Sequence, residues 1–139
     1  ERIAVNGWSY GGFMTTSLML RNPGMFTTAV AGGPVIDWKY YEVMYGERYM
    51  DTPQENPEGY ETAKVANYIK NLDGKMLIIH GSVDPVVVPQ HSMSLLQEAV
   101  KQKTQIDFFT YPMHEHNVRG MDRVHLVEKM MQYIVENNK

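Results

Sequence analysis

One serine stands in a pattern that favours nucleophilic chemistry. Residues 7–11 read Gly-Trp-Ser-Tyr-Gly, a G-x-S-x-G motif centred on Ser9. The motif directly follows the apolar run 2–6, which predicts a strand, and directly precedes residues 10–21, which predict a helix. A sharp strand-to-helix turn would lift the Ser9 hydroxyl above the sheet edge. This context predicts that Ser9 is a nucleophile.

The neighbours of Ser9 suit such a turn. Gly7, Gly11 and Gly12 are small enough to let a strand and a helix pack closely on either side of it. The first N–H groups of the following helix would point toward the reaction centre, because they have no partner within the helix. We expect the N–H of Tyr10 to be one donor to an oxyanion.

A serine hydroxyl is a weak nucleophile at neutral pH, so an acid and a histidine base are expected downstream in the order Ser, Asp, His. Asp84 follows the apolar run 76–79 at a predicted strand end. The next predicted strand ends in the loop 112–117, which carries His114 and His116, and either histidine fits the role of base. Three other histidines lie at a strand end or in helical patterns and are interpreted as structural: His80, His91 and His125.

The His-x-His spacing of residues 114–116 also raises the possibility of a metal site. No third ligand of suitable spacing stands nearby, so we expect neither a metal nor a cofactor.

The elements that must position these residues alternate along the chain. Predicted strands are residues 2–6, 27–31, 75–80 and 105–111. Predicted helices are residues 10–21, a segment capped by Asn56-Pro57 that runs to Asn71, and two segments with apolar positions at Met93, Leu96, Ala99, Val100 and at Val124, Val127, Met131, Ile134. This order predicts an α/β fold with a mostly parallel sheet of about four strands and helices on both faces.

Composition excludes several classes of protein. The 139 residues are 43% hydrophobic and 21% charged, with a net charge of -3, which argues against a basic nucleic-acid-binding surface. No apolar run approaches the roughly 20 residues that cross a bilayer. The chain has no cysteine, which excludes disulfides, thiolate metal sites and a cysteine nucleophile.

Four motifs together resemble one known family. GWSYGG at residues 7–12, WKYYEVMYGERYM at 38–50, HGSVD at 80–84 and HEHNV at 114–118 are similar to the C-terminal catalytic region of the prolyl oligopeptidase family. Within it they fall on the dipeptidyl peptidase IV branch, and the pattern is most similar to the bacterial prolyl tripeptidyl peptidases. The resemblance implies an α/β-hydrolase fold with Ser9 as nucleophile, Asp84 as acid and His116 as base, because the family's histidine follows an acidic residue.

The same resemblance implies a substrate, a peptide with proline at its P1 position, from which a di- or tripeptide is released. The positions that match the family's proline pocket are Tyr10, Val35, Trp38, Tyr41, Tyr45 and Val87. An aromatic core cluster is the alternative for Trp38, Tyr40, Tyr41 and Tyr45. Glu42 matches an acidic residue that holds the substrate's free amino terminus, and a solvated surface glutamate is its alternative. Pro85-Val86 stand where dipeptidyl peptidase IV has Asp-Asn, which favours tripeptide release.

The resemblance also bears on the extent of the chain. A strand at residues 2–6 and the lack of the family's upstream tyrosine predict that residues 1–139 are the C-terminal portion of a hydrolase domain, without its first strands and its β-propeller. We then expect an exposed sheet edge, self-association or a homodimer through that edge, and weak activity of this portion alone. The family implies a periplasmic or cell-envelope location. An esterase and a catalytically idle interaction domain are the alternative functions.

Overall fold

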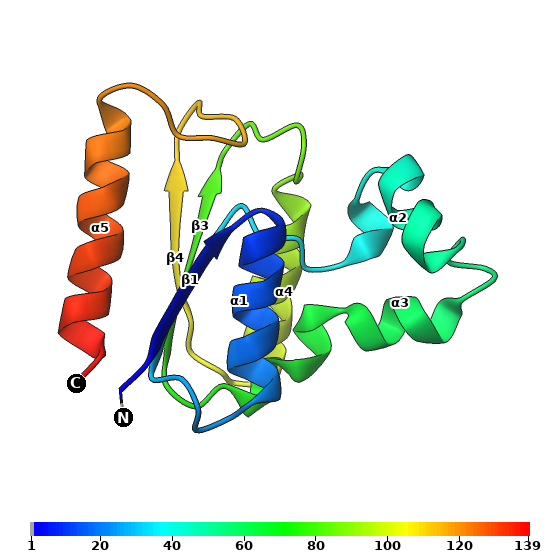
Figure 1. Ribbon diagram of the computed structural model, residues 1–139, viewed down its shortest axis with the longest axis horizontal. Coiled ribbons are helices and arrows are strands. Elements are labelled where there is room, and N and C mark those ends of the chain that lie inside the picture. The colour runs from blue at the N-terminus through cyan, green and yellow to red at the C-terminus, as the bar shows by residue number, and fades with distance from the viewer. Residues whose placement is uncertain (1) are drawn as a thin grey trace.

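A single parallel sheet organises the molecule. The computed structural model describes residues 2–139, and its four strands lie side by side in chain order (Figure 1). They are β1 (Ala4–Trp8), β2 (Thr28–Gly32), β3 (Lys75–Gly81) and β4 (Asp107–Tyr111). All three neighbouring pairs are parallel, so the carboxyl ends of the strands meet at one end of the sheet. The prediction of a mostly parallel sheet of about four strands is confirmed.

Helices cover both faces of this sheet. The chain forms the helices α1 (Tyr10–Arg21), α2 (Val43–Met50), α3 (Pro57–Ala63), α4 (Gln90–Lys101) and α5 (Asp122–Asn137), with 3-10 turns η1 (Trp38–Tyr40) and η2 (Val65–Asn71), and α1, α4 and α5 cover the sheet (Figure 1). Figure 1 shows α5 on one side of the sheet and α1 and α4 on the other. Strand residues alternate between the two layers: Ala29, Ala31 and Ile78 pack with α1 and α4, whereas Val30 and Ile79 pack with α5. Helices on both faces were predicted, and the structure confirms them.

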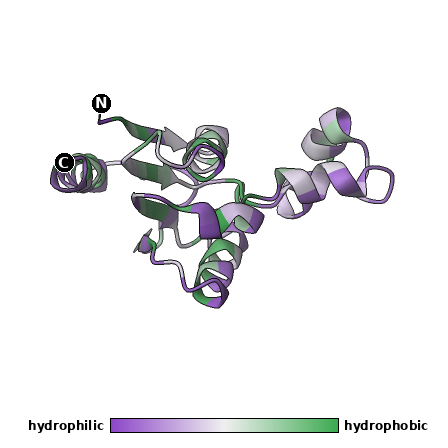
Figure 2. Cartoon of the chain, turned by 90° about the horizontal axis from the view of Figure 1, so that it is seen from below, coloured by the Kyte–Doolittle hydropathy of each residue, from purple (hydrophilic) through white to green (hydrophobic). Residues whose placement is uncertain are grey.

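The segment after β2 forms an arm that stands away from the sheet. Figures 1 and 2 show α2 and α3 projecting beyond the helical layer, and Figure 2 shows this arm as largely hydrophilic. The two helices are tied together where the Tyr60 hydroxyl donates to the carbonyl of Asp51 at 2.9 Å. Because the arm follows the carboxyl end of β2, it lies at the end of the sheet where the carboxyl ends of all four strands meet.

The helix expected from Asn56 to Asn71 is wrong in its length. Its start is as predicted, since the Asn56 side chain accepts the N–H of Gly59 at 3.1 Å and Pro57 is the first helical residue. The α-helix ends at Ala63, because Lys64 turns to ψ 108°. The turn lets the next segment, η2, bury its apolar side chains in the core: Val65, Ala66 and Ile69.

The apolar faces expected for the last two helices are only partly as predicted: Ala99 is buried and Ile134 packs against the core, but other predicted positions are exposed. In α5, Leu126 is buried, whereas Val124, Val127 and Met131 are about half exposed. In α4 the buried residues are His91, Ser92, Leu95 and Ala99, while Met93 and Val100 are exposed. Each helix carries apolar residues on more than one face, and only the face that packs against the sheet is buried.

Strand β1 begins and ends two residues later than expected. Its pairing with β2 continues to Trp8 opposite Gly32, immediately before Ser9. The later end makes the strand run directly into the turn that bears the serine. Across residues 2–139 no helix combines the length and apolar character needed to cross a membrane.

Candidate active site

Ser9 occupies a strained turn between β1 and α1. Its φ of 62° and ψ of -118° lie outside the common regions for a residue with a side chain. The Ser9 N–H donates to the carbonyl of Gly32 at 2.8 Å, and its carbonyl accepts the N–H of Phe13 at 3.0 Å. Both main-chain groups are therefore fixed, one by the neighbouring strand and one by the helix, and together they hold the turn.

Glycine is required at two of the three predicted positions around this turn. A Cβ on Gly7 would lie 2.3 Å from the carbonyl oxygen of Gly11, and one on Gly12 would lie 2.9 Å from the carbonyl oxygen of Gly32. Nothing lies within 4 Å of a Cβ on Gly11, so the expectation that Gly11 must be small is wrong. A side chain at position 11 would extend into open space, although the main-chain carbonyl of Gly11 lies against Gly7.

Tyr10 is the first residue of α1. The N–H groups of a helix's first turn have no helical acceptor, so the Tyr10 N–H is available to a ligand beside Ser9. Tyr10 is 52% exposed, and its ring centroid lies 6.0 Å from that of Trp38. The residue therefore offers a main-chain donor on one side and an aromatic surface on the other.

A buried carboxylate meets a histidine at the carboxyl end of β3. Asp84 Oδ2 lies 2.7 Å from His116 Nδ1, and Asp84 Oδ1 accepts the N–H groups of Val86 and Val87, each at 2.9 Å. Burial has the largest influence on Asp84 and raises its pKa, but hydrogen bonds from His80, His116 and the two amides together bring the pKa below its usual value. The carboxylate is therefore ionised at neutral pH and accepts from the His116 ring.

Three further histidines have side-chain or main-chain partners, and one of them also lies next to Asp84. His80 is buried, with Nε2 2.6 Å from the carbonyl of Val87 and Nδ1 2.6 Å from Ser92 Oγ. His80 Nε2 also lies 3.4 Å from Asp84 Oδ2, so the His80 ring packs directly against this carboxylate. Two others bind side chains away from Asp84: His114 pairs with Asp122 of α5 at 2.7 Å, and His125 of α5 pairs with Tyr111 of β4 at 2.7 Å.

The serine and the histidine converge on the segment that follows β2. A Cβ built on Gly33 would lie 3.3 Å from Cε1 of the His116 ring, while the preceding residue, Gly32, accepts the Ser9 N–H. Among residues 2–139, no hydrogen bond joins the Ser9 hydroxyl to His116. Such bonds often tighten only when substrate binds, so the arrangement is compatible with proton transfer between the two groups.

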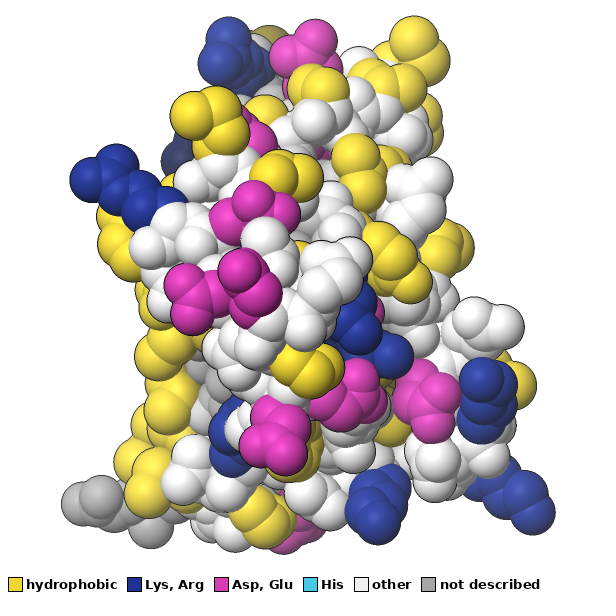
Figure 3. Space-filling view, turned by 90° about the vertical axis from the view of Figure 1, so that its right-hand side faces the viewer, with side chains coloured by type: hydrophobic (Ala, Val, Ile, Leu, Met, Phe, Trp, Pro, Cys, Tyr) yellow, Lys and Arg dark blue, Asp and Glu magenta, His cyan; other side chains and the backbone are white. Residues whose placement is uncertain are grey.

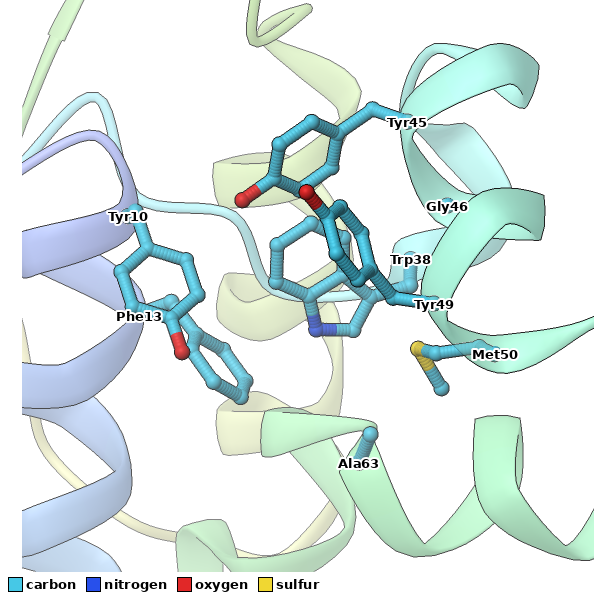
Figure 4. A pocket seen from close by; sticks show the side chains of 8 residues that line it. All are labelled: Tyr10, Phe13, Trp38, Tyr45, Gly46, Tyr49, Met50 and Ala63. Carbon is cyan, nitrogen blue, oxygen red and sulfur yellow. The ribbon is translucent and has the colours of Figure 1, made fainter.

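An aromatic pocket of about 430 Å³ opens beside Tyr10. In Figure 4 the rings of Tyr10 and Phe13, from α1, face those of Trp38, Tyr45 and Tyr49 across it. Trp38 is stacked on Tyr45 with 5.9 Å between ring centroids, which fixes both rings. Aromatic walls with few rotatable bonds suit a flat apolar group.

The residues predicted to form this wall divide into two sets. Tyr10, Trp38 and Tyr45 line the pocket directly. Val35 and Val87 are fully buried in one cluster with Trp38, and Tyr41 packs edge-on against Trp38 at 5.4 Å. This second set does not line the pocket and supports Trp38 from behind.

Several lining residues were not predicted from the sequence. They are Phe13, Gly46, Tyr49, Met50 and Ala63. Phe13 stands three positions after Tyr10, and Tyr49 four positions after Tyr45. These helical spacings place each pair on one face, and they were the available signal.

Glu42 precedes α2 and is exposed. Figure 3 shows the side of the molecule that carries the arm, where Asp and Glu side chains gather among apolar ones. The exposed carboxylates of the arm are Glu42, Asp51, Glu55, Glu58 and Glu61. Their negative charge exceeds the charge of the exposed Arg48 in the same arm, which favours cationic groups on this face. No group of three or more His, Cys, Asp or Glu with metal-site geometry occurs within the described part of the chain.

Comparison with known proteins gives a consistent result. The family model described as the prolyl oligopeptidase family matches residues 1–139. A "Probable dipeptidyl-aminopeptidase B" of Neurospora crassa is 40% identical over 122 residues, and a protein of the same description from Arthroderma gypseum is 42% identical over 120 residues. These matches cover 85% and 84% of this chain but only 13% of each relative.

Two solved structures have the same fold as this chain. A crystal structure described as "a putative dipeptidyl aminopeptidase IV from Bacteroides ovatus" superposes with a TM-score of 0.96 at 56% identity. Porphyromonas gingivalis dipeptidyl peptidase 4 superposes with a TM-score of 0.94 at 34% identity. Each match covers 97% of this chain and 19% of the solved chain, so the present sequence spans about a fifth of those proteins.

Proposed function

This chain belongs to the prolyl oligopeptidase family, and from that premise we propose that it carries the nucleophile, acid and base of a serine exopeptidase. The proposed enzyme removes short peptides from amino termini by cleaving after proline. The observation that carries the proposal is the pairing of buried Asp84 with His116 at 2.7 Å, at the same end of the sheet as the strained turn of Ser9.

The proposed mechanism assigns one task to each of these groups. His116 Nε2 takes the Ser9 hydroxyl proton while Ser9 Oγ attacks the substrate carbonyl, and the same proton is then given to the leaving amine. Asp84 accepts the His116 Nδ1–H, which fixes the tautomer and stabilises the imidazolium that forms. The Tyr10 N–H donates to the oxyanion. Water then hydrolyses the acyl-enzyme, with His116 acting again as base.

The pocket supports selection of proline at the P1 position. Tyr10, Trp38 and Tyr45 present aromatic faces beside the nucleophile, and a pyrrolidine ring is apolar, rigid and small enough to lie between them. Val35, Tyr41 and Val87 are proposed to hold Trp38 and so to define the shape of this site. A bulkier, charged P1 side chain would lose hydration there without gaining a partner.

Glu42 and the acidic arm support an exopeptidase. A peptide's free amino terminus is cationic, and Glu42 is exposed next to a pocket residue, since its carbonyl accepts the N–H of Tyr45 at 3.1 Å. We propose that Glu42 contributes a charge-assisted contact to this amino group and thereby measures peptide length. The names of the relatives favour dipeptide release, whereas Pro85-Val86 after the acid favour tripeptide release.

The function proposed here belongs to a longer polypeptide. We propose, from the family resemblance, that residues 1–139 form the C-terminal portion of its hydrolase domain; they span only 13% to 19% of the relatives and solved structures that they match. The family resemblance implies a second oxyanion donor, a tyrosine hydroxyl, upstream of these residues.

Matched chromogenic peptides test the proposal directly. The full-length polypeptide should release dye from Xaa-Pro or Xaa-Xaa-Pro amides, react with a fluorophosphonate probe, and lose both activities in Ser9→Ala. The ratio of kcat/KM between the two peptides decides dipeptide against tripeptide release. Turnover of simple esters without turnover of either prolyl amide would identify an esterase instead. Failure to react with the probe would indicate an idle interaction domain.

A further inference from the structure

Trp8, the residue before Ser9, contacts the loop that carries His116. Its indole Nε1 donates a hydrogen bond to the main-chain carbonyl of His116 at 2.8 Å, across 108 positions of sequence. The bond connects the strand that presents Ser9 with the loop that presents the proposed base. Among residues 2–139, Trp8 is the hydrogen-bond partner of this carbonyl.

The Trp8 and His116 rings both pack against two adjacent glycines, Gly32 and Gly33. A Cβ on Gly32 would lie 1.8 Å from the Trp8 ring, so the indole occupies the space that a side chain would need. At Gly33, whose φ is +45°, a Cβ would lie 3.3 Å from the His116 ring and 3.5 Å from Trp8 Nε1. Indole and imidazole therefore lie against the same stretch of backbone, and packing fixes the direction of the indole N–H.

Other main-chain hydrogen bonds hold this loop at residues before His116. The carbonyl of His114 accepts the N–H of Val83 at 3.1 Å, and the N–H of Met113 donates to Ser82 Oγ at 2.8 Å. Both hold the loop before it reaches His116. Asp84 holds the His116 ring by Nδ1 but does not hold its main chain, so the ring could still swing about that bond.

We infer that Trp8 is a positioning residue for His116. With Nδ1 held by Asp84 and the carbonyl held by the Trp8 indole, one direction remains for Nε2, the atom that must reach Ser9 Oγ. Displacements of about 1 Å between reacting groups are costly to a chemical step. The inference rests on the proposed function, because it concerns the proton transfer between Ser9 and His116.

A near-isosteric replacement tests the hydrogen bond separately from packing. In the full-length polypeptide, Trp8 is replaced by 3-benzothienylalanine, in which sulfur stands where the indole has N–H, and separately by phenylalanine (Trp8→Phe). The matched control is Tyr133→Phe, which removes a 2.7 Å hydrogen bond to Asp107 between α5 and β4. The measurements are kcat and KM for the prolyl amide, the rate of fluorophosphonate labelling and the thermal midpoint.

Both Trp8 variants should lower kcat and the labelling rate about tenfold, as expected for one lost hydrogen bond, with KM within twofold of the parent. Tyr133→Phe should leave kcat unchanged even where it lowers the thermal midpoint by a similar amount. The inference is overturned if the benzothienyl variant keeps full kcat, or if KM rises while kcat stays constant. A parent that neither cleaves the amide nor reacts with the probe would overturn the proposed function itself, and this is seen before any variant is compared.

Discussion

At the scale of single residues, Asp84 shows how burial and hydrogen bonding together suit a carboxylate to support a base. Burial alone would favour its neutral form, yet the bonds from His80, His116 and two amides keep its pKa low. A low pKa means that the carboxylate is ionised at neutral pH and can accept the Nδ1–H of His116. In the mechanism that we propose, the acid acts through the orientation and charge of the His116 ring.

Asp84→Asn should lower kcat of the full-length polypeptide by about 10³- to 10⁴-fold, with little change in KM. The amide cannot supply the negative charge that stabilises the imidazolium, and it favours the wrong tautomer of His116. Asp107→Asn is the matched control, because Asp107 lies at the opposite end of β4 and binds Tyr133. Equal losses in the two variants would show that the Asp84 effect is structural.

At the scale of secondary-structure elements, the junction between β1 and α1 brings backbone into direct contact with backbone. Gly7 and Gly12 permit contact between backbones, while Gly11 faces open space. Glycines in the same motif therefore differ in whether the fold leaves room for a side chain.

Gly7→Ala should lower the free energy of unfolding by about 2 kcal/mol or more, because its Cβ would meet the Gly11 carbonyl at 2.3 Å. Gly11→Ala adds the same methyl group without a contact within 4 Å and should change stability by less than about 0.5 kcal/mol. Urea unfolding monitored by circular dichroism compares the two variants. A Gly11→Ala variant as unstable as Gly7→Ala would contradict this account.

Helix α4 is joined to the loop after β2 by a buried histidine. His91 Nδ1 accepts the N–H of Ile36 at 3.0 Å and the N–H of Asp37 at 3.3 Å. Burial, with a smaller effect of the neighbouring His80, lowers the pKa of His91 from 6.5 to about 4. The ring is therefore neutral at pH 7, as an acceptor of two amides must be.

This shift predicts a loss of stability in acid. Below pH 6.5 the unfolded chain binds a proton at His91 that the folded chain refuses until about pH 4, so the free energy of unfolding falls across that window. The loss should approach roughly 3 kcal/mol by pH 4. His91→Gln should be less stable at pH 7 yet show a flatter decline between pH 6.5 and 4 in thermal unfolding. An unchanged decline would mean that His91 is not responsible.

At the scale of the whole molecule, the sheet has an open edge beside the active site. Within residues 2–139, β1 pairs with β2 alone, and its strand residues are less buried than those of β2. The half-exposed apolar residues of α5 add uncovered surface: Val124, Val127 and Met131. Unpaired N–H and C=O groups on such an edge favour pairing with another strand.

We expect the isolated 139-residue chain to self-associate through β1 and to be far less active than the full-length polypeptide. Light scattering after size-exclusion chromatography should show a mass that rises with concentration. Asn6→Lys, at an exposed position of β1, should shift this equilibrium toward the monomer, whereas Thr110→Lys on β4, the opposite edge strand, should not. A monomer at all concentrations would contradict the expected association.

The order of the elements and the candidate chemistry could both be predicted from local patterns of residues. Alternating strand and helix patterns predicted the parallel sheet, and the motif around Ser9 stood at a strand-to-helix junction, because local periodicity and glycine content report local backbone geometry. His116 could be chosen over His114 only through the family resemblance, since two histidines in one loop have the same local pattern.

Tertiary structure decided which side chains meet. The pairing of Asp84 with His116 spans 32 positions and the bond from Trp8 to His116 spans 108, so neither is encoded in a local pattern. The sheet likewise selected Leu126 over Val127 as a covered residue of α5, because a helix with two apolar stripes can bury only the one that the sheet contacts. The chain thus specifies its elements locally, whereas its site exists only where parallel strands bring their carboxyl ends together.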